Sequence, residues 1–433
     1  FQHFSYPDVL ESQINATHGS LQAENLLSQL AQQFGRATGR GSALRDALGG
    51  INPKTEAWEP QKPDPHALDK TFEPHDRGSI LVAAVFRAFL SIYRASSADL
   101  FRIASSGTGI LPEGALHPDL TRRLAKEAAK CASRILQMCI RAIDYCPPVD
   151  ITFGDFLRGI LTADLDYVPE DTAGYRTVFI QSFREWGIYP RGVSSMGIDD
   201  LIWPSGDDLF KDLKNREPDQ VGAKSYMEMD LIKAAREDAD WSLGSDRFKI
   251  WQGQDHLRKK LWEWLLAGDH FGRFYAELFG LVIYDHEAPR TVYRNQYNQP
   301  TIEVHSVRPA LRRAINGRVF TDLVVEITQR RRGYFNPEEQ QKIDGRRSNL
   351  KSNVHGDFIY RAGATILIDP VTQDVRRVIR TPGTIANPDE LERVRFFLMN
   401  KCSTGDNAFD AGVYGKTSLR NEPFALLHQR MEE

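Results

Sequence analysis

Apolar residues recur every three or four positions through most of the first 290 residues, which is the period of amphipathic helices. The most apolar stretch runs from Ile80 to Tyr93 and carries one interior charge, Arg87, as expected of a helix buried on most faces. Gly78 and Ser79 before it predict a turn and an N-cap. Because about 14 residues fall short of the roughly 20 that cross a bilayer, we expect no membrane span.

Further helices are predicted over residues 21–34, 118–145, 153–161 and 175–186. A Thr or Asp cap, such as Thr152, opens the third of them. Phe1 and Phe4 have the spacing of the last turn of a helix that Pro7 ends. The five prolines within residues 49–75 predict a surface loop.

The hydrophobic period changes near residue 291 to an alternation of two, which indicates β-strands. Strands are predicted over residues 301–307, 319–329, 357–369 and 375–381. The short turn from Asp369 to Asp374 joins the last two strands, so we expect antiparallel pairing. A polar excursion over residues 333–356 interrupts the strands, and a helix from Pro388 to Met399 follows them.

These patterns predict an α+β fold with three regions. Residues 1–190 form a helical region, residues 191–290 a tryptophan-rich helical region with a hairpin broken near Gly268, and residues 291–433 an antiparallel β-rich module.

The composition is that of an ordinary globular protein, with 433 residues of which 41% are hydrophobic and 26% charged. A net charge of −3 gives no basic excess, so we expect no nucleic-acid partner. The run from Arg330 to Arg332 is more typical of a solvated strand edge than of a nucleic-acid contact. The opening FQHFSYPDVL has neither Met nor a signal-like segment, and we expect it to be cut from a longer protein.

The four cysteines form no CxxC pair, which favours a reducing compartment and a cytoplasmic location. Cys131, Cys139 and Cys146 fall on one side of the predicted helix, and core packing is favoured over metal binding. The acidic run TADLDYVPED, which contains Asp164 and Asp171, could supply oxygen ligands to calcium. Since it lacks a glycine-centred loop spacing, a solvated turn between helices is favoured.

No GxSxG, HExxH, P-loop or dinucleotide-binding glycine motif is present. His75 is the main candidate for chemistry, because it stands at the start of the most apolar helix with Asp69, Glu73 and Asp76 close in sequence. A lone histidine in that position is by default a structural residue with satisfied hydrogen bonds.

Three blocks, taken in order, resemble the C-terminal helical domain of thermolysin-like (gluzincin) zinc metallopeptidases. They are PHDRGSILVAAVF, the pair LHPDLTRRLAKEAAKCASRILQMCIRAI and VDITFGDFLRGILTADLDYV, and YRTVFIQSFREWGIYP. The opening FQHF is similar to the tail of the helix that holds the glutamate zinc ligand of this family.

The resemblance implies a zinc ion held by two histidines of an HExxH helix and by a glutamate of a following helix, all upstream of Phe1. It implies that His75 donates a hydrogen bond to the oxyanion formed from a peptide carbonyl, and that Asp69 or Glu73 orients it. Arg77 stands where the family has an asparagine and is a candidate for substrate binding.

We therefore expect the C-terminal portion of a zinc-dependent endopeptidase that acts on a peptide or protein substrate and that needs ligands from elsewhere to be active. The alternative is a non-catalytic scaffold that retains a peptidase-like fold and binds a protein partner through its β module.

Overall fold

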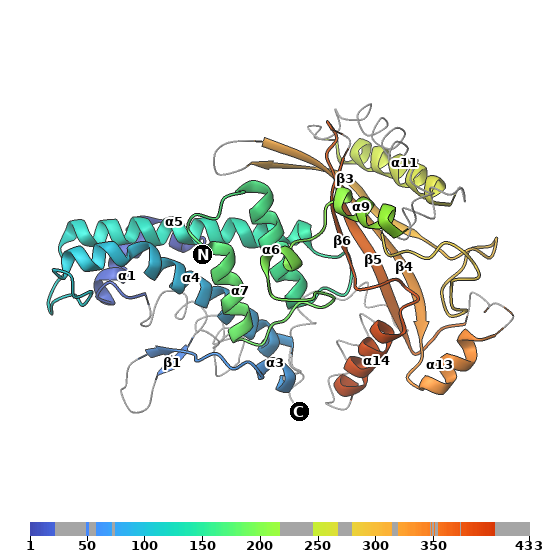
Figure 1. Cartoon of the computed structure of the whole chain (residues 1–433), viewed down its shortest axis with the longest axis horizontal. Coiled ribbons are helices and arrows are strands. Elements are labelled where there is room, and N and C mark those ends of the chain that lie inside the picture. Colours follow the sequence, from blue (N-terminus) through green and yellow to red (C-terminus); the bar gives the residue numbers. More distant parts are fainter. Residues whose placement is uncertain are drawn as a thin grey trace. The chain divides into compact units, whose positions relative to one another are not determined.

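The computed structural model describes residues 1–21, 49–51, 58–71, 74–216, 246–266, 279–313, 319–346, 348, 350, 354–372 and 374–402. Contacts divide the chain into a helical unit and a sheet unit, which confirms the α+β class (Figure 1). The helical unit comprises Phe1–Tyr145 and Thr152–Ile202, and the sheet unit comprises Cys146–Ile151 and Trp203–Glu433. The helix predicted over residues 21–34, apart from Leu21, and the hairpin near Gly268 lie outside the described residues.

The helical unit is built mainly from four long helices. These are α4 (Pro74–Ala104), α5 (Pro118–Ala142), α6 (Phe153–Tyr167) and α7 (Tyr175–Glu185). Shorter elements are η1 (His3–Ser5), α1 (Pro7–Ala16), α3 (Ala67–Lys70), η2 (Ile143–Tyr145), α8 (Ile198–Leu201) and the antiparallel pair β1 (Gly49–Ile51) and β2 (Trp58–Pro60).

The central helix α4 differs from its prediction at both ends. It begins at Pro74, a residue that suits the first turn of a helix because the N–H groups there have no partner within the helix. It then continues through Gly78 and Ser79, so the turn and the N-cap predicted at these residues are wrong. Its 31 residues also make the length argument against a membrane span wrong, since Arg77–Ala104 is long and apolar enough to cross a bilayer. A core helix passes the same test, and much of this stretch is buried in the helical unit.

Proline also begins α1, at Pro7, where the sequence pattern predicted that a helix ends. Phe1 and Phe4 contribute to the aromatic core instead, with ring centroids 5.4 Å and 5.8 Å from that of Phe89. The sequence around Pro7 is compatible with either the start or the end of a helix, and the packing of Phe1 and Phe4 against Phe89 accompanies the start.

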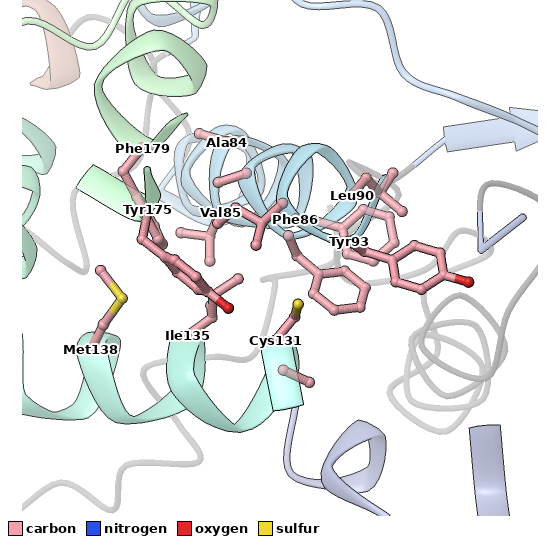
Figure 2. Close-up of a cluster of buried hydrophobic side chains, with 14 of the residues drawn as sticks. Ala84, Val85, Phe86, Leu90, Tyr93, Cys131, Ile135, Met138, Tyr175 and Phe179 are labelled. Atoms are coloured by element: carbon pink, nitrogen blue, oxygen red, sulfur yellow. The ribbon is translucent and has the colours of Figure 1, made fainter. Parts of the chain in front are cut away.

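The core of the helical unit forms where α4 meets α5 and α7 (Figure 2). The labelled side chains that form it are Ala84, Val85, Phe86, Leu90, Tyr93, Cys131, Ile135, Met138, Tyr175 and Phe179. Across this core, Ser182 Oγ donates to the Ala84 carbonyl oxygen at 2.6 Å, and Arg87 Nε lies 2.9 Å from Glu185 Oε2. These contacts hold α7 along α4.

The predicted Thr cap of α6 is confirmed as a capping box between Thr152 and Asp155. Gly159 lets α6 approach the end of α5 closely, because a Cβ there would lie 2.8 Å from the Ala142 carbonyl oxygen.

All four predicted strands are confirmed in one antiparallel sheet of order β3-β4-β5-β6. Their bounds are β3 (Glu303–Arg313), β4 (Val319–Gly333), β5 (Phe358–Ile368) and β6 (Val375–Arg380). Within the described ranges, the helices of this unit are α9 (Gly206–Arg216), α11 (Arg247–Leu266), α13 (Pro337–Asp344) and α14 (Pro388–Cys402).

The sheet unit has two apolar clusters, and both contain even-numbered residues of β5, whose side chains point to the same face of the strand. Ala364, Ile366 and Ile368 join a cluster with Leu257, Leu261 and Leu265 of α11. Phe358, Tyr360 and Ala362 join a second cluster with Leu391, Val394 and Leu398 of α14. The two clusters therefore lie on one face of β5. The helices α11 and α14, which contribute to them, lie toward opposite ends of the strand (Figure 1).

Candidate functional site

The sequence-predicted site lies at the N-terminal end of α4. The backbone of His75 belongs to the first turn of this helix, and Glu73 lies outside the described residues. Asp69 belongs to the short helix α3 just before it, where its side chain is 79% exposed and its Oδ2 lies 3.6 Å from His66 Nδ1. Among the described residues, Asp69 therefore lies beside His66 at the surface.

Arg77 ties α3 to α4. Its Nη1 donates to the carbonyl oxygens of Leu68, at 2.9 Å, and Thr71, at 2.6 Å, which are groups at the C-terminal end of α3 that the helix itself leaves without partners. Burial lowers the pKa of Arg77, and the charge of Asp69 acts in the opposite direction. The guanidinium therefore fixes the C-terminal end of α3 against α4.

The resemblance implies zinc ligands upstream of Phe1, so the residues that the structure describes are not expected to supply them. Within the described ranges, no three His, Cys, Asp or Glu side chains come together as a group that could hold a metal ion.

The acidic run between α6 and α7 is not the solvated turn that the sequence favoured. Asp164 lies in the last part of α6 and is buried, because Arg134 of α5 and Arg176 of α7 neutralise it. Its Oδ1 is 3.2 Å from Arg134 Nη2, and its Oδ2 is 2.9 Å from Arg176 Nη1. Burial raises the pKa of Asp164, while the two arginines act in the opposite direction.

Asp171 completes this cluster from the loop before α7. Its two carboxylate oxygens accept the backbone N–H groups of Tyr175 and Arg176, both at 2.8 Å. A carboxylate at a helix N-terminus also interacts favourably with the helix dipole. The acidic run therefore joins three helices, and the carboxylates of Asp164 and Asp171 are bound by arginines and backbone amides.

Core packing of Cys131 is confirmed, since it is buried among the apolar residues of α4 and α5. Burial raises the pKa of its thiol, and burial raises the pKa of Cys139 to about 12. Thiols with raised pKa values are poor nucleophiles and poor metal ligands at neutral pH.

In the sheet unit, the run from Arg330 to Arg332 is not a solvated edge. These residues lie in β4, which pairs with β3 on one side and β5 on the other, and Arg331 and Arg332 are 3% and 2% exposed. The polar excursion predicted after them contains α13, which Asn336 caps.

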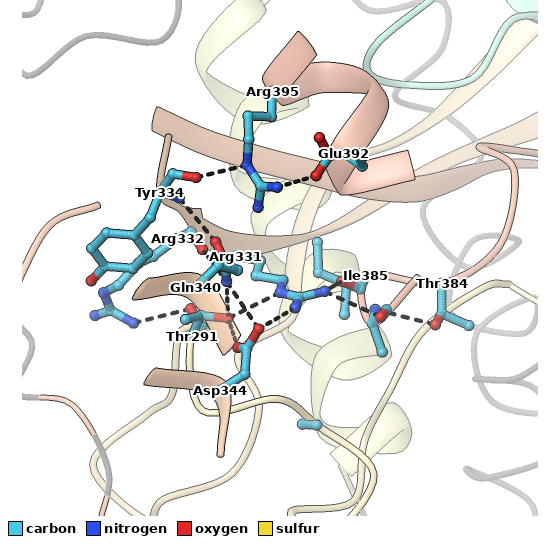
Figure 3. Close-up of polar contacts among 12 residues, drawn as sticks. Thr291, Arg331, Arg332, Tyr334, Gln340, Asp344, Thr384, Ile385, Glu392 and Arg395 are labelled. Atoms are coloured by element: carbon cyan, nitrogen blue, oxygen red, sulfur yellow. Dashed lines mark hydrogen bonds and ion pairs between the residues drawn. The ribbon is translucent and has the colours of Figure 1, made fainter. Parts of the chain in front are cut away.

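Arg331 is the centre of a buried polar network that joins three segments to β4 (Figure 3). Its Nη2 donates to Asp344 Oδ2 of α13 at 2.7 Å, and its Nε donates to Thr291 Oγ1 at 2.9 Å. Its Nη1 donates to the carbonyl oxygens of Ile385 and Ala386, just before α14. The network anchors α13 and the start of α14, so its role is structural.

Both arginine clusters were missed by the sequence analysis, although each left a signal. Arg134 falls on the helical stripe of Cys131 and Met138, and Arg331 has the same parity as the buried Val325 and Ile327 of β4. A charge at a core-facing position indicates a buried partner.

No protein-family model, curated protein or solved structure matches the chain.

Proposed function

We propose that the helical unit is the part of a zinc-dependent peptidase that binds the peptide carbonyl group, with His75 as hydrogen-bond donor to the oxyanion. The observation that supports this most directly is the position of His75 in the first turn of the long buried helix α4. The helices α5, α6 and α7 follow in the order that the resemblance to thermolysin-like peptidases implies.

An oxyanion donor is effective only if the protein holds it in place before the reaction. Two features support such preorganisation. The body of α4 is anchored to α7 through Ser182 and Glu185, and the hydrogen bonds of Arg77 join its first turns to the C-terminal end of α3. Arg77 is then a positioning residue in this proposal.

The metal ligands of such a peptidase would come from outside the residues that the structure describes. The proposal for this chain is therefore limited to His75 and the residues that position it.

The test is hydrolysis of casein by the full-length protein and its variants. His75→Ala should lower kcat by about 100- to 1,000-fold with little change in KM, because the lost contact is made only in the transition state. His75→Gln retains an N–H donor and should recover part of this loss. His286→Ala, at an exposed histidine of the sheet unit, is the matched control and should leave both constants unchanged.

Unchanged turnover in a folded His75→Ala variant would rule out the oxyanion role. Retained hydrolysis after removal of metal by a chelator would contradict the zinc-dependent reaction, and it would do so independently of His75.

A second candidate function is a protein-binding scaffold. It is supported by Phe396 and Met399, which are exposed on α14 although the same helix buries Leu391 and Leu398. If the full-length protein is folded, contains no metal and cleaves no casein, this function is favoured. Phe396→Ser should then reduce capture of a partner, whereas the exposed-site control Asp389→Ser should not.

A further inference from the structure

A cavity of about 270 Å³ lies between the turn after α1 and one side of α4. Its lining consists of Gly19, Ser20, Leu21, Leu90, Tyr93, Arg94 and Phe101. Tyr93 and Arg94 of α4 follow Leu90 by three and four residues, and Phe101 lies about two turns after Arg94, so these residues form one stripe along the helix. Figure 2 shows two of them, Leu90 and Tyr93, on the side of the core cluster away from Tyr175 and Phe179.

The cavity owes its shape to the turn at Gly19. This residue has φ +83°, its N–H donates to the Ile14 carbonyl oxygen at 2.8 Å, and its own carbonyl oxygen accepts from Tyr93 Oη at 2.9 Å. A Cβ at Gly19 would lie only 3.0 Å from the ring of Phe101. The turn therefore depends on glycine, and it holds one wall of the cavity against α4.

The interior of the cavity is mainly apolar. Leu21, Leu90, Phe101 and the ring of Tyr93 contribute its carbon surface, and the Tyr93 hydroxyl is already engaged with Gly19. A dry apolar cavity of about 150 Å³ suffices to hold benzene. The larger volume here has room for an aromatic ring with a short chain.

Arg94 supplies the cation of the lining. It is exposed, and within the described part of the chain its guanidinium makes no hydrogen bond or ion pair. Partial burial lowers the pKa of Arg94, and the nearby charge of Arg87 lowers it further, so the neighbouring charge that acts on it is another cation. A carboxylate would match the fork of its N–H donors with two parallel hydrogen bonds.

We propose that this cavity binds a small monocarboxylate with an apolar, ring-sized body, whose carboxylate pairs with Arg94 and whose body lies against Leu90 and Phe101. The proposal is independent of the proposed peptidase function, because it involves neither His75 nor a metal.

Isothermal titration calorimetry of the full chain with 3-phenylpropanoate tests it. The matched probes are 3-phenylpropanamide, which has the ring without the charge, and acetate, which has the charge without the ring. We expect binding of 3-phenylpropanoate and at least about 10-fold weaker binding of the amide, because hydrogen bonds to a charged partner are the stronger ones. Acetate should not compete.

Two variants separate the roles of charge and shape. Arg94→Gln should weaken binding of 3-phenylpropanoate by about 10-fold or more and leave binding of the amide unchanged. Arg102→Gln, at an exposed arginine of the same helix outside the cavity lining, is the control and should change neither. Leu90→Phe should reduce binding of both ring compounds by filling the cavity.

The proposal is overturned if 3-phenylpropanoate shows no binding up to about 10 mM, the weak end of specific affinity. It is also overturned if Arg94→Gln binds as tightly as the unchanged protein, or if acetate displaces the ligand. Because Arg94 is exposed, its variant is expected to fold, so the result does not depend on Leu90→Phe being stable.

Discussion

Arg176 Nη1 and Asp164 Oδ2 lie 2.9 Å apart inside the helical unit, where their side chains are 6% and 3% exposed. Arg176 also donates to the carbonyl oxygens of Val168 and Pro169, at 2.8 Å and 2.9 Å. One guanidinium therefore connects the end of α6, the loop after it and the start of α7. Removing one partner of such a buried ion pair is strongly destabilising, because the other charge then stays buried without its partner.

Asp164→Asn should lower the free energy of unfolding of the helical unit by about 3–5 kcal/mol, since Arg134 and Arg176 lose the buried anion that they share and, of their ion pairs, keep only the longer ones with Asp171. Chemical denaturation followed by far-UV circular dichroism measures the change. The control is Asp99→Asn on the exposed side of α4, with an expected change within about 0.5 kcal/mol. Equal effects of the two substitutions would contradict a structural role for the buried cluster.

Arg331→Lys should destabilise the sheet unit by about 1–3 kcal/mol, because a lysine cannot reach Thr291, Asp344 and the Ile385 carbonyl oxygen together, so buried polar groups of the network lose a hydrogen bond. Thermal and denaturant unfolding would both report it. Arg346→Lys, at an exposed arginine just after α13, serves as the comparison and should be nearly neutral. A neutral Arg331→Lys would mean that the network contributes little to stability.

Gly78→Ala should stabilise the protein by about 0.5–1 kcal/mol, because Gly78 lies inside α4 and a Cβ there meets no atom within 4 Å. Gly159→Ala provides the contrast within the same unit, since its Cβ would press on the backbone of Ala142. It should be destabilising. If Gly78→Ala also destabilised the protein, Gly78 would act as the turn that the sequence pattern predicted, and α4 would begin after it.

Stability of α9 should decrease in acid through Asp208. A hydrogen bond from Ser205, at 2.6 Å between Oγ and Oδ2, is the main cause that lowers the pKa of this carboxyl. The stabilisation is complete above the unfolded-state pKa of about 3.9 and is lost as pH falls through the lower folded-state value. Hydrogen exchange of α9 amides, compared between the unchanged protein and Asp208→Asn, should differ near neutral pH and converge in strong acid. A difference that persists in strong acid would exclude this carboxylate as the cause.

The elements were predicted well where hydrophobic period and local signals agree. The alternation in β5, the short turn before β6 and the Thr152 cap of α6 are local, and each was read correctly. The ends of α4 were not, because Gly78 and Ser79 have a local preference for turns that burial of the surrounding helix overrides.

The sites were harder to predict, because their partners are distant in sequence. Asp164 contacts Arg134 from 30 residues earlier, and Arg331 contacts Thr291 from 40 residues earlier. Each charged residue looks solvent-exposed when its own segment is considered alone. Arg94 lies just beyond the predicted end of its helix, so the stripe that it shares with Leu90 and Phe101 became visible only with the full length of α4.

Because both apolar clusters contain side chains from one face of β5, they together fix the register of this strand in the sheet. A slip of β5 by one residue would turn Tyr360 and Ile366 to the opposite face together, removing contacts of both α14 and α11. Insertion of one residue in the middle of this strand should therefore be far more damaging than an insertion of the same size in the turn after Ile368. Insertions and deletions in this unit should therefore be tolerated in the connections between elements, whereas the number of residues in β5 is fixed by the packing of α11 and α14 against it.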